Sequence, residues 1–207
     1  STLLKFLQKN KKHIHCQQST ENVNIQNVLI GYRTDEYTKR NILRDLISAA
    51  STLQTRYNQI KDFKENQLNI YFQDIFRSYV QKGNYFLNEQ SQKGKSGTGK
   101  NAGELDFTIE TVEGEMISFF EGFILKGIDR NNILSHIEKT LLSYDANGLK
   151  EKVVGIYSRA NNFSDLAKQY LIYLNEIHIK EIAIVASRDV SEIYLGSSEM
   201  KVYRTEY

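Results

Sequence analysis

The strongest constraint on the fold is a nearly continuous apolar segment at residues 116–124, which reads Met-Ile-Ser-Phe-Phe-Glu-Gly-Phe-Ile. Such a run is typical of a central β-strand that is buried on both faces. Its one charged residue is Glu121. Because burying a lone carboxylate is costly, we expect Glu121 to pair with a Lys or Arg, to bind a cation, or to face water at a sheet edge.

Helical and extended patterns alternate around this segment. Apolar residues at helical spacing predict helices over residues 34–57, from 62–64 to about 82, over 129–144 and from 164 to 176 or 177. Short apolar runs or period-two alternation predict strands over residues 85–87, 105–109, 153–157, 182–186 and 192–195. This order predicts an α/β protein with a mixed central sheet flanked by helices.

Length and composition narrow the class of protein. A chain of 207 residues suits one domain plus an appendage, and we expect an N-terminal helical extension over residues 1–60 and the main domain over residues 61–207. The net charge of +2 excludes a strongly basic coat protein for nucleic acid, although it permits a local basic patch. The single cysteine, Cys16, excludes an intrachain disulfide. No segment approaches the ~20 apolar residues of a membrane span, which predicts a cytoplasmic protein without membrane contact.

Residues 91–103 form a basic, glycine-rich loop between two predicted strands. The segment Gly94–Lys100 has the Gly-x-x-x-x-Gly-Lys spacing of a phosphate-binding loop. Asn101 stands where that motif needs a Ser or Thr, and a strand pattern follows where the motif needs a helix. A plain hairpin loop is one alternative, and we prefer a loop whose lysines contact a phosphate backbone without reading bases. These lysines are Lys93, Lys95 and Lys100.

Two carboxylates are expected to meet on neighbouring strands. Asp106 lies in the predicted strand over 105–109, and Glu113-Gly114 makes a tight turn into the strand that carries Glu121. A carboxylate pair of this kind can hold Mg²⁺ through oxygen ligands. Mg²⁺ in turn can activate water and stabilise charge on a phosphate group.

The order of these elements resembles that of the PD-(D/E)xK nuclease superfamily, the restriction-endonuclease-like fold. That family places a helix before a strand bearing Asp, then a strand bearing (Asp/Glu)-x-Lys, a helix and a further strand. The chain is more closely similar to a bacterial nuclease-like module that is often attached to anti-phage defence proteins. The resemblance covers about residues 62–175, and its matching segments are Glu65–Leu68, Asn88–Ser96, Ala102–Phe107, Phe120–Gly122 and His136–Gly148.

The resemblance implies an αβββαβ core and a Mg²⁺-dependent (or Mn²⁺-dependent) endonuclease that acts on DNA or, less often, RNA. It implies that Asp106 and Glu121 bind the metal ion and that Glu65, on the preceding helix, completes the acidic site. A glutamate at this place can also be an exposed residue near a helix start. Gln90 would position substrate or water.

The chain departs from the family pattern at the catalytic lysine, because Phe123 occupies the position two residues after Glu121. Lys126 is one substitute, although strand alternation places it on the opposite face from Glu121. Lys139, on the next predicted helix, is the preferred substitute. His136, one helical turn earlier, would donate to a phosphate or support the site; the alternative is an ordinary helix histidine whose hydrogen bonds are satisfied locally.

Two functions follow from these expectations. The first is a nuclease effector of anti-phage defence, with nucleic acid as its partner and with a homo-oligomer or a regulatory protein as a further partner. The second is a catalytically degenerate module that keeps the fold and binds nucleic acid or a partner protein. The missing lysine motivates the second function.

Overall fold

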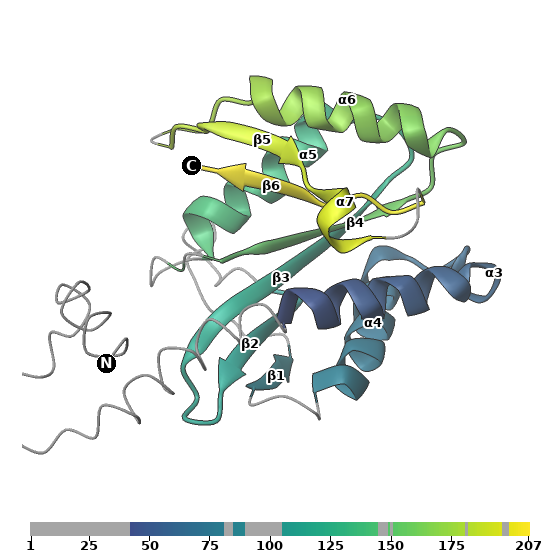
Figure 1. Cartoon of the computed structure of the whole chain (residues 1–207), viewed down its shortest axis with the longest axis vertical. Helices are drawn as coiled ribbons and strands as arrows, with labels where there is room; N and C mark the ends of the chain where they lie inside the picture. Colours follow the sequence, from purple (N-terminus) through teal and green to yellow (C-terminus); the bar gives the residue numbers. More distant parts are fainter. Residues whose placement is uncertain are drawn as a thin grey trace, which may run out of the picture. The chain divides into compact units, whose positions relative to one another are not determined.

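The computed structural model describes residues 42–80, 85–89, 105–144, 149, 151–180, 182–195 and 199–207 (Figure 1). These residues belong to one compact unit, Asn41–Tyr207. The expectations for the start of the first helix and for the basic loop at 91–103 lie outside the described residues.

A mixed four-stranded sheet forms the centre of this unit. Its strands follow the chain order β1-β2-β3-β4. Strands β1 and β2 pair antiparallel, as do β2 and β3, whereas β3 and β4 pair parallel. The strands span Tyr85–Glu89 (β1), Phe107–Thr111 (β2), Met116–Leu125 (β3) and Val153–Ser158 (β4). The predicted mixed α/β architecture is therefore confirmed.

Helices cover both faces of the sheet. One face is covered by three helices: a helix over residues 42–55, the short α3 (Tyr57–Ile60) and α4 (Glu65–Val80). Helices α5 (Arg130–Glu138) and α6 (Phe163–Glu176) pack against the other face. The hydroxyl of Tyr85 in β1 donates to the Asp45 carboxylate at 2.6 Å. Residues 42–55 thus share a core with the sheet.

Strand β3 is the element that both halves of the core share. Phe120 packs into the α4 side of the core, whereas Phe123 and Leu125 pack into the α5 and α6 side. Successive side chains of a strand point to opposite faces, so an apolar run is needed to fill both. The prediction of a central strand buried on both faces is therefore correct.

Helix α5 begins where the sequence predicts, because the Asp129 carboxylate accepts a hydrogen bond from Asn132 N at 3.0 Å. It continues as a π-helical turn over Lys139–Ser143. No helix in the described part of the chain is both long and apolar enough to pass through a membrane.

The C-terminal strand predictions are wrong in detail. The predicted strand over 182–186 contributes only an isolated bridge between Ile179 and Ile182, and strand β5 starts later, over Ala186–Asp189. The Asn175 side chain of α6 bonds both backbone groups of Ser187, at 2.9 and 3.1 Å, which fixes the start of β5. Strand β5 pairs antiparallel with β6 (Tyr203–Glu206) in a separate sheet.

The predicted strand over 192–195 is instead a short helix, α7 (Ser191–Tyr194). Asp189 accepts a hydrogen bond from Ser191 N at 2.9 Å and so starts the turn. The side chains of Ile193 and Tyr194 are exposed. Because neither face of this segment is buried, alternating apolar side chains do not stabilise a strand here, and the local hydrogen bond determines the helical conformation.

We expect Gly155→Ala to destabilise the domain by about 1–3 kcal/mol, since overpacking a filled core costs that much. A Cβ atom on Gly155 of β4 would lie 2.6 Å from Phe120 Cε2. Chemical denaturation measures the free energy of unfolding. Gly127→Ala is the matched control, because its Cβ would meet no atom within 4 Å. Equal stability of both variants would contradict this account of the β3–β4 packing.

Candidate functional site

The candidate site lies where β3 runs past the end of β2. The last pair between these strands is Phe107 with Phe120, whereas β3 continues beside β4 to Leu125. The backbone amides of Gly122 and Ile124 therefore have no partner from β2. Buried amides need an acceptor, and side chains from other elements supply it.

Two carboxylates accept from these amides. Asp106, immediately before β2, accepts from Gly122 N through Oδ2 at 2.7 Å. Glu65, the first residue of α4, accepts from Ile124 N through Oε2 at 3.1 Å. Both acids are therefore fixed on the same edge of β3, although 41 positions separate them in the sequence.

Glu121 points to the other side of β3 and pairs with His136 of α5. Its Oε1 lies 2.8 Å from His136 Nδ1, and both side chains are buried. The imidazole also stacks on the Phe123 ring, with centroids 4.3 Å apart and planes 5° apart. The buried glutamate is thus partnered by a histidine, rather than by a lysine or arginine.

Asn69 and Tyr157 complete the α4 side of the site. Asn69 Nδ2 donates to Gly122 O at 3.0 Å. Within the described residues, Asn69 Oδ1 and the Tyr157 hydroxyl are buried without a hydrogen-bond partner. A Cβ on Gly122 would collide with Asn69 Oδ1 and lie 2.8 Å from the Phe120 ring, so the close approach needs glycine.

Burial, together with the neighbouring negative charges, raises the pKa values of two groups in the site. Burial raises the pKa of Asp106 to about 7; the Gly122 N–H opposes the shift, and the charges of Glu121 and Glu65 add to it. Burial, followed by the charges of Asp106 and Glu65, raises the pKa of the Tyr157 hydroxyl well above its usual value. In the described part of the chain, no Lys or Arg forms an ion pair with these three carboxylates.

Of the candidate residues predicted from the sequence, the structure brings four together and places Lys139 away from them. Glu65, Asp106 and Glu121 gather around residues 121–124 of β3, with His136 on Glu121. Lys139 is exposed, and its ammonium forms no ion pair with a carboxylate of the described residues. Gln90 and the loop lysines fall outside those residues; they are Gln90, Lys93, Lys95 and Lys100.

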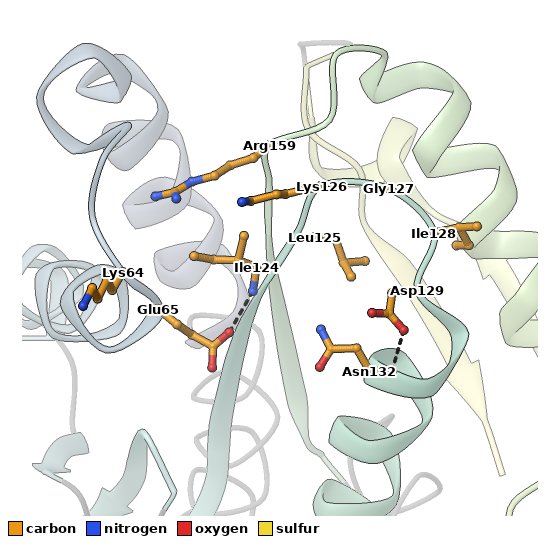
Figure 2. Close-up of a pocket in the computed structure, with 10 residues that line it drawn as sticks. All are labelled: Lys64, Glu65, Ile124, Leu125, Lys126, Gly127, Ile128, Asp129, Asn132 and Arg159. Atoms are coloured by element: carbon orange, nitrogen blue, oxygen red, sulfur yellow. Dashed lines mark hydrogen bonds between the residues drawn. The ribbon is translucent and has the colours of Figure 1, made fainter.

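Lys126 follows β3 directly and, with Glu65, lines a pocket of about 610 Å³ (Figure 2). Sequence reasoning did not select Asn69, Tyr157 or Arg159, which are also near these acids or this pocket. The signal for Asn69 was a polar residue among the apolar positions of α4, four residues after Glu65. Tyr157 and Arg159 carried no comparable signal.

Strand β2 also bears on the phosphate-loop interpretation of Gly94–Lys100. That motif requires a helix after its lysine, whereas the described residues that follow form a strand over Phe107–Thr111. The structure therefore argues against a nucleotide-binding loop of that type.

The donor set can be compared with the needs of a divalent cation. No group of three or more His, Cys, Asp or Glu side chains in the described segments has the arrangement of a metal site. Mg²⁺, however, is usually held by one or two carboxylates together with water and substrate phosphate. The half-buried carboxylates of Glu65 and Asp106, which have no ion pair within the described residues, and the unpartnered Asn69 Oδ1 fit an ion of that kind.

No protein-family model, curated protein or solved structure matches this chain.

We expect Asp106→Asn to stabilise the metal-free protein above pH 7, by at most about 4 kcal/mol. The pKa of Asp106 rises from 3.8 to about 7 on folding, so the folded state binds more protons between these values. Stability of the parent therefore falls as the pH rises from about 4 to 7, and the neutral amide removes this loss. Denaturation curves at pH 4, 5.5, 7 and 8.5 measure it. A stability difference independent of pH would contradict the shift.

Proposed function

We propose that the chain is a metal-dependent nuclease that cleaves phosphodiester bonds in DNA, as a cytoplasmic effector of bacterial anti-phage defence. The observation that carries the proposal is that Glu65, Asp106 and Glu121 lie close together where β3 runs past the end of β2. Among the described residues, no Lys or Arg forms an ion pair with them. Acids kept together without a Lys or Arg partner are typical of a site that binds a cation.

The topology supports this proposal. Helix α4, strands β1 to β3, helix α5 and strand β4 follow one another along the chain. Their sheet order, with the last pair parallel, is compatible with the αβββαβ core that the resemblance to PD-(D/E)xK nucleases implies. Glu121 lies within β3, which is compatible with the motif of that superfamily, whereas Asp106 lies one residue before β2 instead of within the strand.

In this proposal Asp106 and Glu121 hold Mg²⁺ or Mn²⁺, and Glu65 supports them. The bound ion supplies activation of water and stabilisation of charge on the phosphate. The chain's own residues fix the acids: the Gly122 and Ile124 amides hold Asp106 and Glu65, and His136 holds Glu121. Such hydrogen bonds orient ligands before the ion arrives. A homo-oligomer would place two such sites on the two strands of a duplex.

The position of the catalytic lysine separates this proposal from its alternative. Phe123 occupies the family's lysine position and packs on His136. The sequence favours Lys139 as the substitute, whereas Lys126 lies in the pocket that contains Glu65. The filled Phe123 position favours the second candidate, a catalytically degenerate module that keeps the fold and binds nucleic acid or a partner protein.

We expect Mg²⁺ or Mn²⁺ to raise the melting temperature of the parent. At about ten times Kd the gain is about 1.4 kcal/mol, or ~3–5 °C for a domain of this size. Asp106→Asn and Glu121→Gln should lose the shift, because each removes a charged ligand. Glu192→Gln, an exposed acid on α7, is the control that keeps it. Equal shifts in all four proteins would exclude this metal site.

We expect the parent to cleave DNA with Mg²⁺ or Mn²⁺, and Asp106→Ala and Glu121→Ala to lose on the order of 100-fold or more in rate, since each lacks a group that positions the ion. Cleavage of a labelled duplex and of a labelled RNA measures the rate. Lys139→Ala and Lys126→Ala identify the substitute lysine by the larger loss, and Lys168→Ala on α6 is the control. Cleavage that is equal in the parent and both acid variants would sink the assignment.

A further inference from the structure

The pocket beside the candidate site opens at the carboxyl ends of the two parallel strands. Its lining includes Lys126, directly after β3, Arg159, directly after β4, and the segment that begins α4. Arg159 N donates to Leu125 O at 2.7 Å, which holds the two strand ends together. Ligands of α/β sheets bind preferentially outside the carboxyl ends of parallel strands, where the chain turns away. Here β3 and β4 are the parallel pair.

The charged side chains of this pocket are unequally engaged. Its acids are Glu65 and Asp129, and each already accepts a backbone amide, from Ile124 and Asn132 respectively. Its cations are Lys64, Lys126 and Arg159. Within the described residues, no ion pair or hydrogen bond engages the ammonium groups of Lys64 and Lys126.

The guanidinium group of Arg159 is held in place by one hydrogen bond and has further N–H donors for a ligand. One of its guanidinium nitrogens donates to the Phe63 carbonyl oxygen, just before α4. A guanidinium group carries five N–H donors in a fixed plane, so the others remain for a ligand. Figure 2 shows Lys126 and Arg159 extending in the same direction across the pocket, towards the segment that precedes α4.

From this geometry we propose that the pocket binds a phosphate group, through Lys126 and Arg159 with Lys64 at its rim. The pocket volume of about 610 Å³ is within the range that takes a nucleotide-sized ligand. Arginine and lysine together are the usual donors to phosphate oxygens. The phosphate belongs either to a nucleic-acid strand that continues past Glu65 or to a free nucleotide.

The proposal that the phosphate belongs to a nucleic-acid strand rests on the proposed function, because the pocket shares Glu65 with the candidate nuclease site. A strand that enters the acidic site would place its next phosphates towards the cations. This contact is independent of base identity, since the lining offers charges to phosphate oxygens. Binding without metal tests the pocket separately from cleavage.

The test measures the binding of a fluorescent single-stranded oligonucleotide by anisotropy, in EDTA, over a series of salt concentrations. Each phosphate contact contributes about 0.7 to the slope of log K against log salt for a single strand. Lys126→Ala should weaken binding for all base sequences and lower the slope by about 0.7, and Lys126→Glu should weaken it further. Lys168→Ala, an exposed lysine on α6, should leave the slope unchanged.

Calorimetry with adenosine 5′-monophosphate, and with adenosine as the phosphate-free control, forms the second arm. Loss of nucleotide binding in Lys126→Ala, with oligonucleotide binding unchanged, assigns the pocket to a free nucleotide. A loss of slope with the oligonucleotide assigns it to a strand. If Lys126→Ala and Lys126→Glu match the parent in both arms, the proposal is overturned.

The outcomes also separate this proposal from the nuclease assignment. If cleavage depends on Asp106 and Glu121 while binding is unaffected by substitution of Lys126, the phosphate-pocket proposal is excluded and the nuclease assignment stands. If binding depends on Lys126 but no cleavage occurs, the phosphate-pocket proposal stands and the catalytically degenerate module is favoured.

Discussion

The site depends on one backbone constraint: strand β3 is longer than the partner that pairs with its β2 edge. The ladder between them ends at Phe120, and the next amides on that edge would be buried without acceptors. An unpaired buried amide costs as much as a lost hydrogen bond. The carboxylates of Asp106 and Glu65 meet that need, and they are brought together as a result. The same contacts that complete the sheet therefore concentrate negative charge.

The packing of β3 explains why the site has two sides. The strand is covered by α4 on one face and by α5 on the other, so its alternating side chains enter different cores. Gly122 leaves room for Asn69 on the α4 face, whereas Glu121 meets His136 on the α5 face. Burial on both faces removes solvent that would otherwise screen the acids. The raised pKa of Asp106 is the electrostatic consequence.

The sequence predicts the elements that long patterns determine. The apolar run of β3, the helices α4 and α6 and the order of helices and strands along the chain from α4 to α6 are recovered because many residues contribute to each pattern. Short C-terminal elements are not recovered. The helix α7 has only four residues, and its two apolar side chains, Ile193 and Tyr194, are exposed. The hydrogen bond from Ser191 N to Asp189 decides the backbone conformation there. The late start of β5 likewise depends on Asn175, which lies on a different helix.

The sequence by itself determined that an acid lies within a central apolar strand and that a second acid belongs to the neighbouring extended segment; the structure places this second acid, Asp106, immediately before β2 instead of within a strand. Only the tertiary structure decided what those acids contact. His136 as the partner of Glu121, Asn69 against Gly122, and Lys126 beside Arg159 all join residues from different elements. Patterns along the chain report which face of an element is buried. They do not report where neighbouring strands end, and the end of β2 is what leaves the β3 amides to Asp106 and Glu65.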